Sequence, residues 1–173
     1  MNIDDFRYMW RGKPLRPLAK KEAHLLEPVN LRQEGQERAL LLFHGFSSTP
    51  AVYRQMIPSL NHYDAIVCPA LPGHAISFAA FSTAKANDWI AKAEETCAAL
   101  IKNYQKVDVV GFSLGGLLAC HLSQRFELNH LYLLAPALAL RLPLELSLKS
   151  AKLLHFLGFR SLRNRAGNLY TKQ

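Results

Sequence analysis

Short apolar runs alternate with longer stretches of helical periodicity along most of the chain, beginning at Ala39. The apolar runs are residues 39–43, 64–71, 107–112 and 131–138. They are apolar almost throughout, as is typical of parallel strands that are covered on both faces. This alternation predicts an α/β fold, in which a mostly parallel twisted sheet carries helices on both faces and the crossovers are right-handed.

The stretches between these runs predict three helices. The first covers residues 48–60 and has a proline in its first turn, where proline is favoured. The second covers 87–104, where Asn87 or Asp88 is the expected cap, and the third covers 114–126.

The two ends of the chain differ in character from this core, which we place at residues 39–138. Residues 1–38 are expected to form an N-terminal extension or edge strand, because HLLEPVNL (24–31) fits an antiparallel strand at a sheet edge. Residues 139–173 are expected to begin a cap or lid, or to form a C-terminal helical tail. Within them, 148–159 fits either a surface helix over the sheet edge or a helix that touches a membrane.

The net charge of +8 arises mainly from the C-terminal end of the chain. Residues 141–173 contain seven of the 21 basic side chains and one of the 13 acidic ones. A basic tail of this kind is more often a solvated surface than a binding site, so we do not favour a nucleic-acid partner.

Composition excludes several classes of protein. No apolar stretch reaches the roughly 18 residues of a membrane-spanning helix, and the N-terminal sequence lacks the apolar run of a signal peptide. Cys68, Cys97 and Cys120 are widely spaced in apolar surroundings and predict buried free thiols in a reducing compartment. No CxxC pair or HExxH spacing occurs, so we expect no metal and no other cofactor. These features predict a soluble cytoplasmic protein.

One motif that carries chemistry lies at the junction of a predicted strand and helix. The sequence Gly111-Phe112-Ser113-Leu114-Gly115 has the GxSxG pattern. A serine on so sharp a turn has a strained backbone, and side chains two residues before and after it would collide unless both are glycine. The turn also places the hydroxyl at the N-terminus of a helix, where negative charge is stabilised. Ser113 is therefore the candidate nucleophile.

The sequence His44-Gly45-Phe46 directly follows the first predicted parallel strand. Acyl transfer needs hydrogen-bond donors directed at the oxyanion of the tetrahedral intermediate, and a tight turn beside glycine can present a backbone N–H there. We predict the N–H groups of Phe46 and Leu114 as the two donors. We expect His44 to hold the turn through a hydrogen bond of its ring.

These motifs together resemble the α/β-hydrolase superfamily, especially its small carboxylesterases and monoacylglycerol-lipase-like members. The resemblance is carried by the strings LLLFHGFSSTP, LPGH, VDVVGFSLGG and LYLLAPAL, over about residues 39–138. It implies a small-molecule carboxylic ester as substrate and a reaction without a cofactor. It also implies a nucleophile at Ser113 and oxyanion donors at Phe46 and Leu114, supported by the motif residues His44, Gly45, Gly111 and Gly115.

The chain departs from the family pattern after the nucleophile, where the family has an acid and then a histidine. No aspartate follows Ser113, and the histidines that follow it are His121, His130 and His155. His121 lies about 12 Å away along the helix, at about 1.5 Å per residue, and His130 begins the next strand at its far end. Either another polypeptide supplies the acid and base, or His155 approaches the site, or the chain is a truncated, noncatalytic remnant or binding protein.

Two further residues, His74 and Asp108, bear on the missing base and acid. His74, in the loop after the second predicted strand, is a candidate substitute base, because that loop leaves the same edge of the sheet. Asp108 is excluded as the acid, because five strand residues at about 3.3 Å each separate it from Ser113.

The strand at 131–138 is expected to leave an open edge of apolar composition. Such an edge pairs readily with other chains. We therefore expect either that the C-terminal apolar segment folds over it or that the protein associates with itself there.

Overall fold

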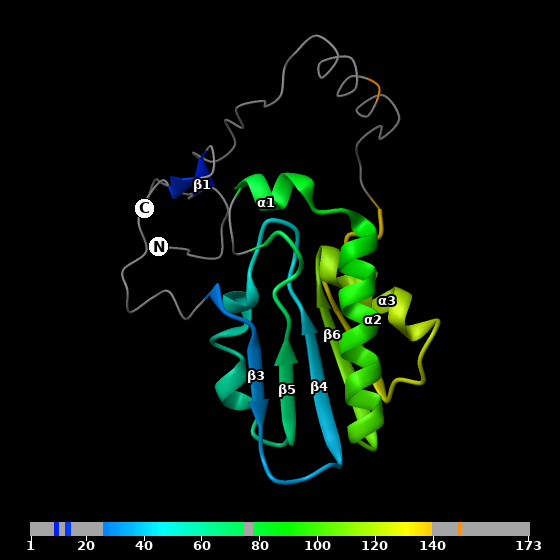
Figure 1. Ribbon diagram of the computed structural model, residues 1–173. Coiled ribbons are helices and arrows are strands. Elements are labelled where there is room, and N and C mark those ends of the chain that lie inside the picture. Colours follow the sequence, from blue (N-terminus) through cyan, green and yellow to red (C-terminus); the bar gives the residue numbers. More distant parts are fainter. Residues whose placement is uncertain (1–8, 11–12, 15–25, 75–77, 140–148, 150–173) are drawn as a thin grey trace. The chain divides into compact units, whose positions relative to one another are not determined.

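The computed structural model describes residues 9–10, 13–14, 26–74, 78–139 and 149. Among these residues, five strands form one sheet in the order β3-β5-β4-β6-β7, as Figure 1 shows for the first four. The strands are β3 (Val29–Arg32), β4 (Arg38–Phe43), β5 (Ala65–Cys68), β6 (Lys106–Phe112) and β7 (His130–Leu134). All pairs are parallel except β3 with β5. The predicted α/β class, with a mostly parallel sheet, is confirmed.

Strand β4 lies at the centre of the sheet, between β5 and β6. Its residues from Ala39 to Phe43 are at most 1% exposed. Both faces of a central parallel strand are covered, so the strand is apolar at every position and not only at alternate ones. All four predicted strands are present, although β5 ends at Cys68, because the following Pro69 has no N–H for the ladder.

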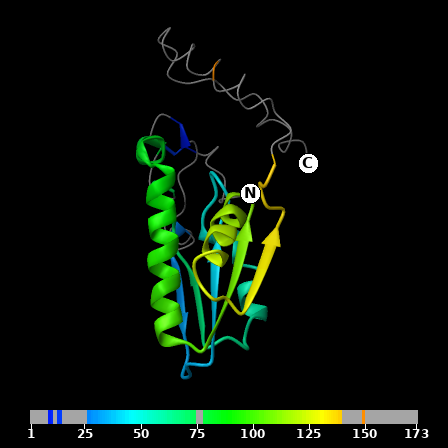
Figure 2. The same cartoon turned by 90° about the vertical axis from the view of Figure 1, so that its right-hand side faces the viewer.

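Helices α2 (Ala86–Asn103) and α3 (Leu114–Ser123) pack against one face of the sheet. Figure 2 shows α2 as a long helix beside that face. Buried residues of the two helices meet side chains of β4 and β6 in one apolar cluster; they include Ala93, Cys97, Leu100, Leu118, Ala119 and Leu122. This face provides the rigid support on which the turn after β6 rests.

The opposite face is covered by two short 3-10 turns, η3 (Pro50–Tyr53) and η4 (Ile57–Ser59). The α-helix predicted for residues 48–60 is therefore wrong as to type. Its apolar positions do face the core, but Pro58 lacks an N–H and prevents a continuous α-helical ladder.

The ends of the two long helices differ from the prediction. Helix α2 is capped at Lys85 and not at Asn87 or Asp88, and the Lys85 N–H donates to Asp88 Oδ2 at 2.8 Å. Asp88 thus satisfies a free N–H from inside the first turn, where its charge also suits the helix dipole. Helix α3 ends at Ser123, earlier than predicted.

The two edges of the sheet differ. Strand β3 pairs antiparallel with β5, as predicted for residues 24–31, although it starts only at Val29. No strand among the described residues pairs with the outer side of β7, where Tyr132 and Leu134 are 44% and 42% exposed. The sequence did not predict the short helix α1 (Phe78–Thr83) or the separate hairpin of β1 (Met9–Trp10) and β2 (Lys13–Pro14).

The chain divides into two compact units, Met1–Ala137 and Leu138–Gln173. The predicted helix at 148–159, apart from Lys149, lies outside the described residues.

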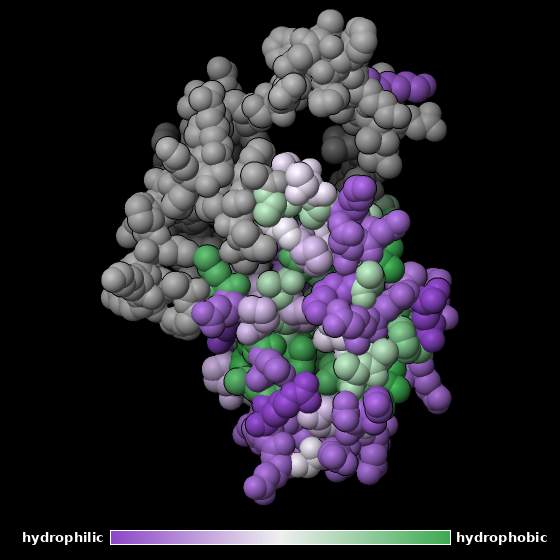
Figure 3. Space-filling view, in the orientation of Figure 1, coloured by the Kyte–Doolittle hydropathy of each residue, from purple (hydrophilic) through white to green (hydrophobic). Residues whose placement is uncertain are grey.

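Hydrophilic side chains cover much of the surface over α2 in Figure 3, as expected for an amphipathic helix.

The cysteines agree in part with the prediction of buried free thiols. Cys68 and Cys97 are free and buried, and burial raises the pKa of the Cys97 thiol to about 11, whereas Cys120 is only half-buried. In the described part of the chain, no helix is long and apolar enough to cross a membrane, and no cluster of three metal-binding side chains occurs.

Candidate active site

Ser113 lies on the turn between β6 and α3, at the carboxyl edge of the parallel strands. Its backbone has φ 54° and ψ −113°, a combination that side-chain-bearing residues rarely adopt. The turn is fixed from both sides, because the Ser113 N–H donates to Leu134 O at 3.0 Å and the Ser113 carbonyl accepts the N–H of Ala137 at 3.1 Å. Strain of this kind persists where surrounding contacts determine the backbone, and it is common at active sites.

The glycines of the motif are required by close approach of the main chain. A Cβ at Gly111 would collide with the Gly115 carbonyl and lie 2.6 Å from Gly116 Cα. A Cβ at Gly115 would collide with the carbonyl oxygen of Phe43 at the end of β4. The steric reason given for the GxSxG spacing is therefore present in the structure, and α3 begins in direct contact with the end of the central strand.

The turn at His44-Gly45-Phe46 lies beside Ser113. A Cβ at Gly45 would lie 3.2 Å from Ser113 Cβ and 3.3 Å from the Phe112 ring. The two motifs are far apart in the sequence and meet because β4 and β6 are parallel neighbours whose carboxyl ends are in register. Leu114 is the first residue of α3, so its N–H has no acceptor within the helix.

The His44 ring is fully buried and has a defined tautomer. Nε2 accepts the N–H of Leu71 at 3.1 Å, so the proton of the neutral ring is on Nδ1, which donates to Gly45 O at 3.0 Å. Burial, with a smaller contribution from the neighbouring His74, lowers the pKa of His44 to about 4. The ring is therefore neutral at physiological pH, and its hydrogen bond to Gly45 O holds the turn.

The Gly45 carbonyl fixes the direction of the next N–H. It accepts the N–H of Ser48 at 3.2 Å in addition to the His44 hydrogen bond. The peptide unit between Gly45 and Phe46 is planar and trans, so the Phe46 N–H points in the direction opposite to the Gly45 carbonyl. The two hydrogen bonds that hold this carbonyl therefore also fix the direction of the Phe46 N–H. Ser47 at φ 55° then reverses the chain into the segment that leads to η3.

Aromatic rings gather next to this turn. The Phe46 side chain is 56% exposed, and its ring centroid lies 4.9 Å from that of Phe81 and 6.1 Å from that of Trp89. The buried His74 ring lies 4.8 Å from Phe81 and 5.4 Å from Trp89. His74, considered as a substitute base, is thus enclosed by rings, and burial lowers its pKa.

Two described histidines that follow Ser113 have partners other than Ser113. His121 Nε2 lies 2.7 Å from Glu94 Oε1 on α2, and this hydrogen bond is the main cause of the lowered pKa of Glu94. His130 lies at the start of β7, beside Asp108. The Ser113 hydroxyl makes no hydrogen bond with any described residue, and His155 lies outside the described residues.

Asp108 is the centre of a buried polar cluster near the amino end of β6. Its carboxylate accepts hydrogen bonds from Tyr63 at 2.7 Å, Arg38 at 2.8 Å and Asn129 at 2.6 Å, and lies 3.1 Å from His130 Nδ1. Burial opposes the charged form, but these hydrogen bonds outweigh it and lower the pKa of Asp108. Asp108 therefore links several strands and loops, and it does not face Ser113.

Comparison with protein families decides the identity of the fold. The model described as "Alpha/beta hydrolase family" matches residues 40–171. The chain belongs to the alpha/beta hydrolase family. Comparison with curated proteins gave no match.

Two solved structures have a similar fold. One, described under "LipS and LipT, two metagenome-derived lipolytic enzymes", has a TM-score of 0.61 and 23% identity, and the match covers 71% of this chain and 51% of that one. MenH from S. aureus has a TM-score of 0.53 and 14% identity, with 74% and 48% covered. The chain thus spans about half the length of these two proteins.

Sequence reasoning missed three features of the structure, two at this edge of the sheet and one at the opposite edge. The placement of Phe81 and Trp89 beside Phe46 had no sequence signal beyond their aromatic character. The link from Leu71 to His44 involves a backbone N–H, which every residue but proline has. The Asp108 cluster had one signal, a charged residue in an otherwise apolar strand, which is rare without partners.

Proposed function

We propose that this alpha/beta hydrolase chain acts on carboxylic esters and that Ser113 is its nucleophile. In the proposed reaction Ser113 Oγ attacks the ester carbonyl, and the N–H groups of Phe46 and Leu114 stabilise the oxyanion. The C–O bond to the alcohol then breaks, the alcohol leaves with a proton, and water hydrolyses the acyl-serine to a carboxylic acid. No cofactor enters this scheme.

The observation that carries the proposal is the position of Ser113. Its strained backbone raises the side chain at the start of α3, within contact distance of the Gly45 turn. An ordinary helix-capping serine needs neither the positive φ nor the close approach of a second glycine turn. The lipolytic character stated for the LipS and LipT structures is compatible with an ester substrate.

The scheme also needs a base and an acid. Within the described residues, no histidine is bonded to Ser113, and a serine without a base loses several orders of magnitude in rate. We propose the core at 39–138 as the part that holds the nucleophile and the oxyanion donors, and the segment 139–173 as a cap or tail. His155 is the candidate base within this segment.

A serine-directed probe tests the nucleophile. The purified chain is incubated with a fluorophosphonate, and hydrolysis of a short-chain p-nitrophenyl ester is followed in parallel. We expect labelling that is lost in Ser113→Ala and retained in Ser123→Ala, a matched exposed serine at the end of α3. Labelling that persists in Ser113→Ala, or none in the wild-type chain, contradicts the proposal.

A second candidate function is noncatalytic binding. The observation in its favour is the absence of a histidine or carboxylate partner for Ser113 among the described residues. The same assay with His155→Gln separates the alternatives, because a base at His155 predicts at least a hundredfold loss of ester turnover. Turnover that is indistinguishable from the uncatalysed rate in every variant favours the binding function.

A further inference from the structure

We infer that Trp89 is a positioning residue for the oxyanion turn, acting through the Leu71–Pro72 segment and the His44 ring. The inference deepens the proposed function, on which it rests, because it names a residue that sets the direction of the Phe46 N–H. Three hydrogen bonds in series connect Trp89 to the turn, and each is formed by groups that are wholly or partly buried.

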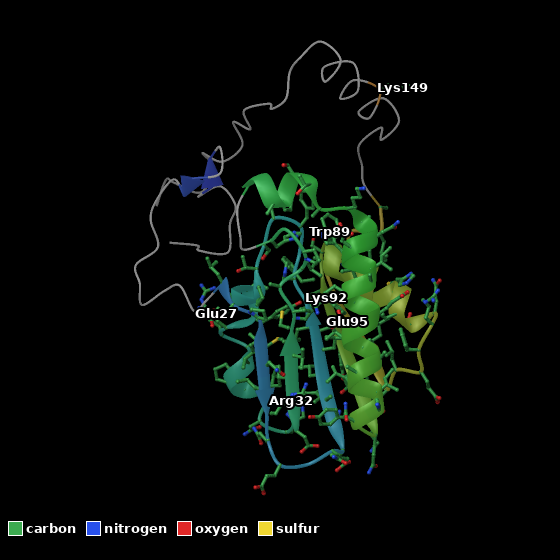
Figure 4. All side chains as sticks on the ribbon, in the orientation of Figure 1. Glu27, Arg32, Trp89, Lys92, Glu95 and Lys149 are labelled. Atoms are coloured by element: carbon green, nitrogen blue, oxygen red, sulfur yellow. The ribbon has the colours of Figure 1, made fainter. Side chains whose placement is uncertain are left out.

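The first link joins the beginning of α2 to the loop after β5. Trp89 Nε1–H donates to the Pro72 carbonyl at 2.9 Å. Figure 4 shows Trp89 near the end of α2 that lies beside the loops at the carboxyl edge of the sheet. The helix end that carries it is held by the Lys85–Asp88 hydrogen bond and by the core residue Ala93. The indole donor is therefore fixed to a rigid element.

The second link joins this loop to the ring. Leu71 is 1% exposed, and its N–H donates to His44 Nε2. Proline fixes its own φ, and the His74 N–H closes the turn onto Leu71 O at 2.9 Å. Few backbone torsions between Leu71 N and Pro72 O are therefore free to rotate. For this reason, the hydrogen bond that Trp89 makes to the Pro72 carbonyl also restricts the orientation of the Leu71 N–H.

The third link joins the ring to the oxyanion turn. The bond from Leu71 leaves Nδ1 as the protonated nitrogen of the neutral ring, and Nδ1–H donates to Gly45 O. That carbonyl and the Phe46 N–H belong to one planar unit and point in opposite directions. Loss of the Trp89 hydrogen bond thus affects the Phe46 N–H in two steps. It loosens the Leu71 N–H that keeps the His44 proton on Nδ1, and it thereby loosens the Gly45 carbonyl, which shares a peptide unit with the Phe46 N–H.

The variant that tests the series is Trp89→Phe. Phenylalanine keeps an aromatic ring beside Phe46 and His74 but has no N–H to donate to Pro72. Trp10→Phe is the matched control, since Trp10 is the other tryptophan of the chain. Both variants are made in the full chain.

Hydrogen exchange provides a readout that is independent of reactivity. In Trp89→Phe we expect the Leu71 amide to exchange about tenfold faster than in the wild type, because its acceptor geometry is less restricted. The amide of Val109, in the centre of β6, should exchange at an unchanged rate. Equal exchange at Leu71 in Trp89→Phe and the wild type, or an equal acceleration in Trp10→Phe, overturns the inference.

Fluorophosphonate kinetics provide the functional readout. We expect the maximal labelling rate at Ser113 to fall about tenfold in Trp89→Phe while the half-saturating probe concentration is unchanged, since the donor acts on the transition state. An unchanged maximal rate overturns the positioning role. If the wild-type chain is not labelled at all, the proposed function fails, whereas the exchange at Leu71 still decides whether Trp89 holds the turn.

Discussion

His44 Nε2 accepts the backbone N–H of Leu71 at 3.1 Å, so the loop after β5 determines which nitrogen of a buried ring carries the proton. The other nitrogen holds the turn that faces Ser113. The neutral form of the ring is thus built into the geometry of the site, and this has a consequence for stability at acidic pH.

We predict that the free energy of unfolding decreases as the pH falls from about 6.5 to about 4. Burial lowers the pKa of His44 to about 4, below its ordinary value of 6.5, so between these values the unfolded chain binds a proton that the native state does not. Above pH 6.5, His44 is neutral in both states and the free energy of unfolding has its full value. By pH 4, protonation of His44 in the unfolded chain has lowered it by roughly 3 kcal/mol. Urea denaturation at a series of pH values measures it.

The control for this prediction is His62→Gln, which removes an exposed histidine and should leave the pH dependence unchanged. In His44→Gln the dependence between pH 6.5 and 4 should become shallower. An equally steep dependence in that variant would show that other groups cause the loss.

We predict that Ser113→Gly stabilises the protein while it abolishes probe labelling. Glycine adopts φ 54°, ψ −113° without a Cβ clash, so the substitution should raise the free energy of unfolding by about 1 kcal/mol. Ser123→Gly, at the end of α3, should lower it by up to about 1 kcal/mol. Thermal denaturation compares the two, and a destabilised Ser113→Gly would mean that the turn is not strained.

We predict that alanine destabilises the protein much more at Gly111 than at Gly45. Gly111→Ala places a Cβ against the Gly115 carbonyl and should cost about 3 kcal/mol of stability, because main chain on both sides must move. Gly45→Ala meets Ser113 Cβ at 3.2 Å and should cost about 1 kcal/mol or less. Chemical denaturation ranks the two variants, and the reverse order would contradict the described turn.

We predict that Asp108 serves the fold and not the reaction. Asp108→Asn leaves Arg38 and Tyr63 without a charged partner and should cost about 3 kcal/mol of stability, with the labelling rate of Ser113 unchanged in the folded protein. Glu37→Gln removes the exposed pair with Lys106 and should cost under about 0.5 kcal/mol. Selective loss of labelling in stable Asp108→Asn would place Asp108 in the reaction.

We predict that the backbone of Phe46, and not its ring, supports the reaction. Phe46→Ala keeps the N–H, and because the side chain is 56% exposed, stability and the maximal labelling rate should change little. Phe46→Pro removes the N–H and should lower the maximal labelling rate about 100-fold, the usual effect of losing one oxyanion donor. Circular dichroism verifies that both variants are folded. Equal maximal labelling rates in Phe46→Ala and Phe46→Pro would exclude the Phe46 N–H as an oxyanion donor.

The strands and the Ser113 turn could be predicted because their causes are local. The run at 39–43 is apolar at each position because both faces of β4 are covered, and Gly111 and Gly115 flank Ser113 because main chain occupies the space of their side chains. The helix predicted at 48–60 failed for an equally local reason, since apolar spacing indicates burial while Pro58 decides the hydrogen-bond pattern.

The sequence by itself determined the parallel sheet, the strained serine turn and the glycine turn that faces it, because backbone sterics and burial act at fixed spacings. Only the tertiary structure decided that Leu71 selects the His44 tautomer, that Trp89 holds the loop through Pro72, and that Asp108 is shared by four partners. These contacts join residues far apart in the chain, and their donors include backbone amides that no sequence pattern distinguishes.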